Sequence, residues 1–223
     1  MTNLQWMAVV GIGCSVVLPG TSAFAKNVKN VDGGDWWQWA LATPTNHNPL
    51  LDTTGADCAV GQTGKVWFLA GTFGGGSVQR ACTIPKNKQL FFPVVNAVNI
   101  DTPNVCGQGP DHVSVADLRV FPKTFVDNAT NLSAELDGAS LAFQREVSPV
   151  FTVTLPADNI FDSGCIAAGL GDVPGGKFQP AVDDGVYAAL DELSPGTHIL
   201  HFHADTPGQP SVDVTYTLTV EGN

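Results

Sequence analysis

Two histidines that are two residues apart are the first candidates for chemistry in this sequence. His201 and His203 fall in an expected strand over residues 197–205, so their side chains point to the same face about 6.6 Å apart. That spacing can chelate one metal ion, with Asp205 as a further ligand and Asp213 of the expected neighbouring strand close by. Neutral imidazoles and a carboxylate suit a divalent transition metal such as zinc, copper or iron. The competing interpretation, which we favour, is a row of polar side chains on an outer sheet face.

Tryptophans form the second candidate group. Trp36, Trp37 and Trp39 are clustered near the start of the chain. Indole faces exposed on a rigid protein can stack on sugar rings, which would make these three the ligand-binding residues of a carbohydrate-binding module. The stronger interpretation is that they belong to the core, because Trp36 and Trp39 share a helix face with Ala40.

Acidic residues offer a weaker possibility. Residues 32–35 (DGGD) and the pair Asp183 and Asp184 carry the oxygen ligands that calcium requires. Asp and Gly are also the common residues of solvated turns, and we favour that interpretation of both segments.

Catalytic motifs are missing from the sequence, which contains no G-x-S-x-G, H-E-x-x-H or P-loop string. We therefore interpret the chain as a non-catalytic binding or structural module with a carbohydrate or protein ligand. The alternative is a metal-dependent enzyme that uses His201 and His203.

Cysteines indicate the compartment. Cys14 lies in an apolar leader, and the even number that remains favours two disulfides in an oxidising space. Four cysteines allow three pairings, and we predict the one that closes the shorter loops, Cys58 with Cys82 and Cys106 with Cys165.

The amino-terminal segment has the layout of a cleaved secretory signal. A predominantly apolar run over residues 4–18 precedes the small-residue site Ala23-Phe24-Ala25. We predict a signal peptide over residues 1–25, followed by a single secreted or periplasmic β-rich domain over residues 26–223. Gly11, Gly13, Pro19 and Gly20 interrupt this region and disfavour a retained membrane span, which needs about 20 apolar residues.

The charge of the chain excludes one class of partner. The sequence has 21 acidic and 10 basic residues, and its net charge is −11. A phosphate backbone would be repelled by such a surface, so we do not expect a nucleic-acid ligand.

Alternating apolar residues indicate the fold class. Leu200, Phe202 and Ala204 alternate with polar residues, and residues 212–220 repeat the pattern. This period of two is typical of antiparallel strands with one buried face. We predict a mainly β fold, an antiparallel immunoglobulin-like β-sandwich with one or two short helices.

Local signals place further elements. They predict a helix over residues 36–42 that is capped by Asp35, a hairpin over residues 65–84, and a helix after Ser114 that Pro122 should kink or shorten. Residues 90–95 read as an apolar strand whose proline suits a sheet edge or a bulge. Asp137-Gly138 marks a tight hairpin turn, and residues 100–112 are the best candidate for a subdomain boundary.

Several strings together support a family resemblance. The chain contains WWQWALATP, NPLLDTTGADC, GQTGKVWFLAGT, CTIP, LFFPVVN, SPGTHILHF and VTYTLTV. In these strings it resembles a family of secreted bacterial β-rich proteins with no assigned activity. The resemblance implies bacterial export and a β-rich fold, and it implies no reaction.

Overall fold

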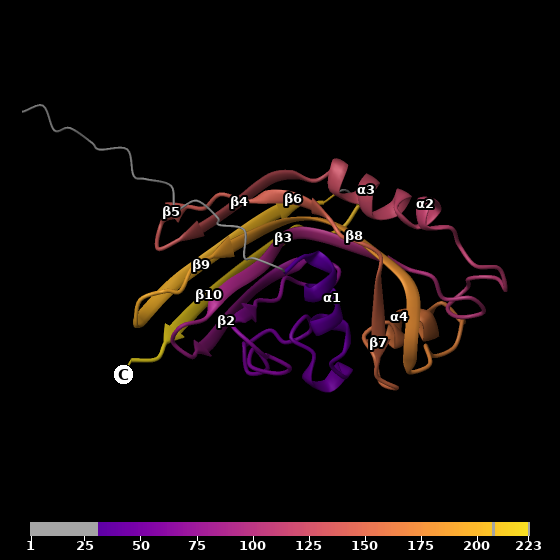
Figure 1. Ribbon diagram of the computed structural model, residues 1–223, viewed down its shortest axis with the longest axis horizontal. Helices are drawn as coiled ribbons and strands as arrows, with labels where there is room; N and C mark the ends of the chain where they lie inside the picture. The colour runs from indigo at the N-terminus through magenta and orange to yellow at the C-terminus, as the bar shows by residue number, and fades with distance from the viewer. Residues whose placement is uncertain (1–30, 207, 223) are drawn as a thin grey trace, which may run out of the picture.

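Two stacked β-sheets form the centre of the computed structural model, which describes residues 31–206 and 208–222 (Figure 1). Sheet 1 has the strand order β1-β3-β8-β6, with β7 also paired to β8, and sheet 2 has the order β2-β10-β9-β4-β5. The strands of sheet 1 are β1 (Val66–Phe68), β3 (Gln89–Ile100), β6 (Gln144–Val147), β7 (Phe151–Leu155) and β8 (Gly176–Leu190). Those of sheet 2 are β2 (Gly76–Ile84), β4 (Thr130–Leu136), β5 (Ala139–Ser140), β9 (Gly196–Asp205) and β10 (Val212–Val220).

The first core lies between the two sheets. The predicted alternation of β9 is confirmed, because Leu200, Phe202 and Ala204 are fully buried there. Phe92 of β3 meets Phe202 across the interface, with ring centroids 5.0 Å apart. Interdigitated side chains of this kind supply most of the hydrophobic stabilisation of a sandwich.

The second core covers the opposite face of sheet 1. Helix α1 (Gly33–Leu41) packs there against β3, β7 and β8, and Figure 1 shows it beneath the arch of the strands. Phe91 and Tyr187 stack in this core with ring centroids 5.0 Å apart. The central strands β3 and β8 are therefore buried on both faces, as strands in the middle layer of a three-layer structure must be.

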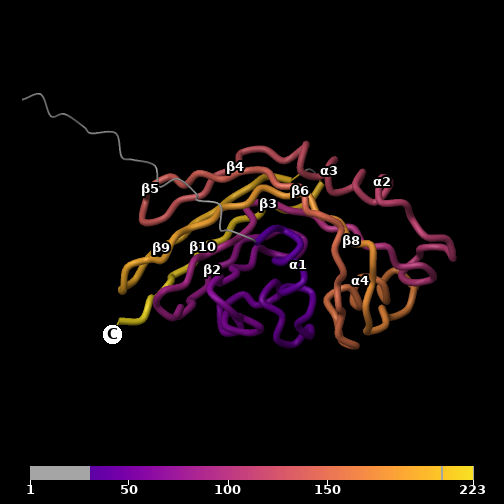
Figure 2. Tube along the Cα trace, viewed as in Figure 1, coloured from indigo at the N-terminus to yellow at the C-terminus, as the bar shows by residue number. Residues whose placement is uncertain are grey.

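The remaining helices flank these layers. Helices α2 (Val115–Leu118) and α3 (Val120–Asp127) lie on the side of sheet 1 opposite α1 (Figure 2). Helix α4 (Asp162–Ala167) precedes β8, and a short 3-10 helix, η1, spans Thr45–His47. Among the described residues, no helix is both long and apolar enough to cross a membrane. The predicted signal peptide, residues 1–25, lies outside the described residues.

Helix signals were placed correctly to within a few residues. Helix α1 starts earlier than predicted, because Asp32 rather than Asp35 is the N-cap and the two carboxylates form a reciprocal capping box. Ser114 caps α2 as predicted. The expected helix is divided in two at Arg119, and Pro122 lies in the first turn of α3, where a proline needs no N–H.

The sheets are mixed, which corrects the predicted antiparallel immunoglobulin-like arrangement. The chain is mainly β, yet β1 pairs with β3 in parallel and β10 pairs with β2 in parallel. The predicted hairpin over residues 65–84 is also wrong, because β1 belongs to sheet 1 and β2 to sheet 2. Strands that precede the candidate boundary at residues 100–112 pair with strands that follow it: β3 with β8 in sheet 1, and β2 with β10 in sheet 2. Parallel pairs require long connections, which local turn signals do not reveal.

Both predicted disulfides are confirmed, including their pairing. Cys58 bonds Cys82 and Cys106 bonds Cys165, with sequence separations of 24 and 59 residues. The first fastens the loop before β1 to β2, and the second fastens the loop after β3 to α4.

Removing each disulfide should destabilise the fold, since the unfolded chain gains conformational freedom. Replacing both cysteines of one pair by serine is expected to lower the free energy of unfolding by about 3.5 kcal/mol for Cys58–Cys82 and about 4 kcal/mol for Cys106–Cys165. Urea titration measures both values. Detection of four free thiols in the native protein, at Cys58, Cys82, Cys106 and Cys165, would contradict the prediction.

Candidate functional site

A groove runs along the edge of β3 that faces away from β8, and we refer to it as the β3 groove. Its larger part has a volume of about 480 Å³ and is lined continuously by residues 93–98. A smaller part of about 170 Å³ continues past Val98 to Asn99 and Ile100. Val98 and Phe161 line both parts, so the two form one depression along the strand.

The groove exists because β3 extends well beyond its short neighbour β1. β1 pairs with β3 only over residues 89–91, whereas β8 pairs with β3 along nearly its whole length. No other described strand pairs with the β1 side of β3 beyond residue 91. We call this stretch, residues 93–100, the open edge. The prediction that Pro93 marks an edge or a bulge is confirmed, since the register shifts between Pro93 and Val95.

Aromatic side chains form the walls of the groove. Phe121 and Phe125 of α3 line it on the side of the first core, while Trp36, Trp37 and Phe161 line it on the side of the second core. Residues 71–75, which follow β1, also line the groove. Phe121 is 54% exposed, unusually high for a phenylalanine.

The groove carries no charge. Among the described residues that line its two parts there is no Asp, Glu, Lys, Arg or His, although the chain contains 31 Asp, Glu, Lys and Arg residues. Its polar lining consists of amide and hydroxyl side chains such as Asn96 and Gln209. Both lining cysteines, Cys106 and Cys165, are joined in a disulfide. The site can therefore bury an apolar ligand, but it offers no titratable group for acid–base chemistry.

The three predicted ligand-binding tryptophans are buried. Trp36 is 1% exposed, and Trp37 and Trp39 are also in the second core. Each indole N–H already donates a hydrogen bond within the protein: Trp36 to the Leu69 carbonyl, Trp37 to Asp183 and Trp39 to the Val60 carbonyl. Trp36 and Trp37 contribute to the groove wall, and the structure presents no indole face of the three for stacking on a sugar.

A buried carboxyl group supports this wall. Asp183 of β8 is 1% exposed, and its Oδ1 accepts hydrogen bonds from Trp37 Nε1 at 2.7 Å and from the Tyr187 hydroxyl at 2.9 Å. Asn96 Nδ2 donates in turn to the Tyr187 hydroxyl at 3.0 Å. The chain of bonds thus joins α1, β8 and the groove residue Asn96.

Burial sets the protonation state of Asp183. Loss of solvation raises the pKa of Asp183 to about 8, against the lowering effect of the Trp37 and Tyr187 hydrogen bonds. Its Oδ2 has no hydrogen-bond partner among the described residues. A Cβ atom on Gly33 would lie 2.1 Å from this oxygen, which explains a glycine in the first turn of α1.

The prediction of a solvated turn at Asp183 and Asp184 is wrong, because both lie inside β8 and are buried. They point to opposite faces of sheet 1. Asp184 forms a two-point ion pair with Arg145, whose Nε and Nη2 lie 2.8 Å from its two oxygens.

The raised pKa of Asp183 makes stability depend on pH. The folded protein keeps a proton that the unfolded chain releases above pH 3.8, so stability falls as the pH rises from 3.8 to about 8. Asp183→Asn keeps the acceptor for Trp37 and Tyr187 and removes the ionisation. We expect this variant to gain stability relative to the wild type across that range, by up to about 1.4 kcal/mol per pH unit.

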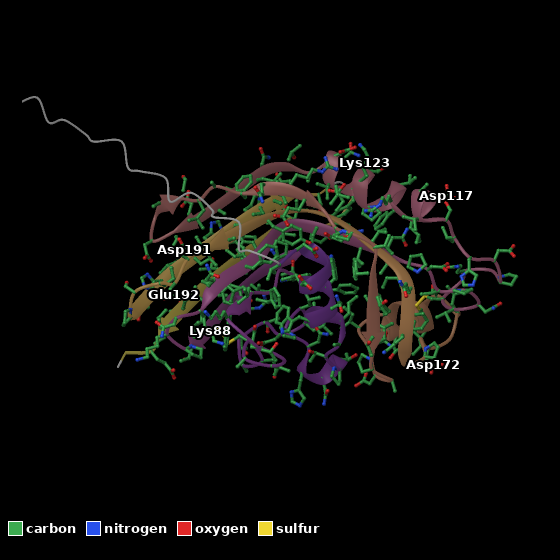
Figure 3. The ribbon with its side chains drawn as sticks, in the orientation of Figure 1. Lys88, Asp117, Lys123, Asp172, Asp191 and Glu192 are labelled. Atoms are coloured by element: carbon green, nitrogen blue, oxygen red, sulfur yellow. A yellow bond between two sulfur atoms is a disulfide. The ribbon has the colours of Figure 1, made fainter. Side chains whose placement is uncertain are left out.

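Chemical denaturation at several pH values measures this difference. Asp172→Asn is the control, because Asp172 is exposed in the loop before β8 (Figure 3). A difference between wild type and Asp183→Asn that stays constant between pH 4 and pH 8 would contradict the assignment of a buried protonated acid.

The predicted histidine pair lies on the outer face of sheet 2. His201 Nε2 is 2.8 Å from Asp213 Oδ1, and His203 Nε2 is 3.1 Å from Asp205 Oδ1. The structure therefore brings together the four side chains that the sequence analysis named. Each imidazole hydrogen-bonds its own carboxylate, and within the described residues no group of three or more His, Cys, Asp or Glu side chains could hold a metal ion.

A second histidine cluster has the residues of a catalytic triad without its chemistry. Asp137 Oδ2 lies 2.7 Å from His198 Nδ1, and Ser194 Oγ lies 3.4 Å from His198 Nε2. However, Nε2 also faces the Ser194 carbonyl oxygen at 2.9 Å, which requires a proton on that nitrogen. The hydrogen bond to Asp137, and then that to Ser194, raises the pKa of His198. An imidazole that holds this proton cannot accept one from the serine hydroxyl.

Sequence reasoning missed the groove as a site. Its floor was identified only as a strand with a proline, and its wall residues Phe121 and Phe161 are 40 positions apart in the sequence. Pro93 was the one local signal of an open edge. The partial coverage by β1 that leaves this edge open depends on strand pairing, which no local pattern encodes.

Comparisons with known proteins found no match: the chain matches no protein-family model, no curated protein and no solved structure.

Proposed function

We propose that the protein is a non-catalytic binding module that holds an apolar ligand in the β3 groove. The observation that carries this proposal is an uncharged, aromatic-walled depression with a volume of about 480 Å³, a size and lining typical of ligand sites. Its rim exposes Phe121 and Phe73, two large apolar side chains that water solvates poorly.

A binding role fits the groove better than an enzymatic one. Proton transfer needs a titratable side chain beside the ligand, and a hydroxyl nucleophile needs a base to activate it; the described lining has threonine hydroxyls but no Asp, Glu, Lys, Arg or His. The buried positions of Trp36, Trp37 and Trp39 weigh against a saccharide, so we favour the apolar part of a protein ligand.

We further propose that this module works in the periplasm or outside the cell. The leader pattern over residues 1–25 supports export. The two disulfides support an oxidising compartment, since such bonds are rare in reducing cytoplasm.

An uncharged fluorescent dye, Nile red, tests for the site. Its emission should rise on binding to the purified protein, and Gly71→Leu should abolish the change. Gly71 lines the groove, and a Cβ there meets nothing within 4 Å, so the larger side chain extends into open space. Phe121→Ala should weaken the affinity for the dye by about tenfold, which is equivalent to ~1.4 kcal/mol of lost apolar contact.

Two control variants lie outside the groove. Gly109→Leu adds the same bulk at another glycine whose Cβ position is empty. Ile199→Ala removes a 45% exposed apolar side chain from β9. If Gly71→Leu and Gly109→Leu bind the dye equally well, the groove is not the site and the proposal fails.

A further inference from the structure

We propose that the ligand is an extended, uncharged segment of another polypeptide, which joins sheet 1 as an additional strand along the open edge of β3. This inference rests on the proposed function of the groove and specifies its ligand. Strand addition of this kind uses backbone hydrogen bonds for affinity and side-chain pockets for specificity.

Successive residues of β3 direct their N–H and C=O groups alternately to β8 and to the open edge, and this alternation identifies the groups that an added strand would meet. Asp101 N–H donates to the Pro180 carbonyl on the β8 side at 2.9 Å. Because bonding direction alternates along an antiparallel strand, Ala97 and Asn99 also face β8, while Asn96, Val98 and Ile100 direct their N–H and C=O groups to the open edge.

No described strand pairs with these outward groups, because β1 pairs with β3 only over residues 89–91. Ile100 N–H donates to the neighbouring Asn99 Oδ1 at 3.1 Å. The N–H and C=O groups of Asn96 and Val98 therefore have no strand partner on this side among the described residues. Backbone groups at the floor of an apolar groove bind a partner strand strongly, since water competes poorly there.

The walls suit the alternating side chains of an added strand. Successive residues of a strand point to opposite faces of its sheet. On one face they would meet Phe121 and Phe125, and on the other Trp37 and Phe161. The open edge, residues 93–100, extends over about 27 Å, enough for seven or eight paired residues. A compact small molecule would contact only part of that length.

The absence of charged side chains from the described groove lining limits which segments could bind as the added strand. The uncharged lining disfavours any segment with buried Lys, Arg, Asp or Glu, because desolvating an unpaired charge is costly. Residues 26–30, which precede the described part of the expected mature chain, include Lys26 and Lys29 and only one apolar residue, Val28. They do not match this edge, so the geometry favours a segment from another protein.

A displayed library of random seven-residue peptides, screened for displacement of Nile red, tests this inference. We expect enrichment of uncharged peptides with apolar residues, and loss of their binding to Gly71→Leu but not to Gly109→Leu. A synthetic copy of each binder is then N-methylated at one position at a time. Methylation should weaken binding at least tenfold at every second residue and less than threefold at the residues between.

The protein side of the pairing has its own variant. Val98→Pro removes an N–H that faces the open edge and not β8, a position where a sheet tolerates proline. Both this variant and Val98→Ala shorten the same groove-lining side chain, but only Val98→Ala keeps the N–H, so Val98→Pro should bind the peptide at least tenfold more weakly than Val98→Ala does.

Each outcome separates the two proposals. If Nile red binds in the groove but no peptide displaces it, or if N-methylation has no alternating effect, strand addition is overturned while the binding function stands. If neither dye nor peptide distinguishes Gly71→Leu from Gly109→Leu, both proposals fail. A dimer in sedimentation that Val98→Pro dissociates would assign the edge to a second copy and overturn the inference.

Discussion

Strand β3 is buried on both faces but paired along its full length on only one edge, and most features of the molecule follow from this condition. Two-sided burial demands a layer above and a layer below, which sheet 2 and α1 provide. The short β1 covers the second edge over only three residues. The exposed remainder is flanked by the same apolar layers that bury the faces, so the edge becomes the floor of an uncharged groove.

A buried acid holds one of those layers in place. Asp183 connects α1 to sheet 1 through Trp37 and reaches the groove through Tyr187 and Asn96. Its hydrogen bonds orient the indole that forms part of the wall, and desolvation keeps its carboxyl group protonated up to pH of about 8. A polar network inside an apolar core specifies one packing arrangement, because any other would leave these groups unpaired.

Sequence patterns predicted individual strands but did not predict which strands pair with each other. Alternation located β9 and β10, and the Asp137-Gly138 turn located the β4–β5 hairpin, because both signals act over a few residues. Residues 65–84 resembled a hairpin for the same local reasons, yet β1 and β2 join different sheets. The direction that the chain takes between them depends on their parallel partners, one of which, β10, lies far along the chain.

The sequence alone determined the β-rich composition, the even number of cysteines that allows two disulfides, and the shared face of His201 and His203. These follow from residue periodicity and from cysteine number, whereas the structure decided which of the three possible cysteine pairings forms. Only the tertiary structure decided that Trp36, Trp37 and Trp39 are core residues, that Asp183 is buried, and that β3 has an open edge. Each of those depends on which distant segments exclude water from a given side chain or backbone group, and no local pattern records that.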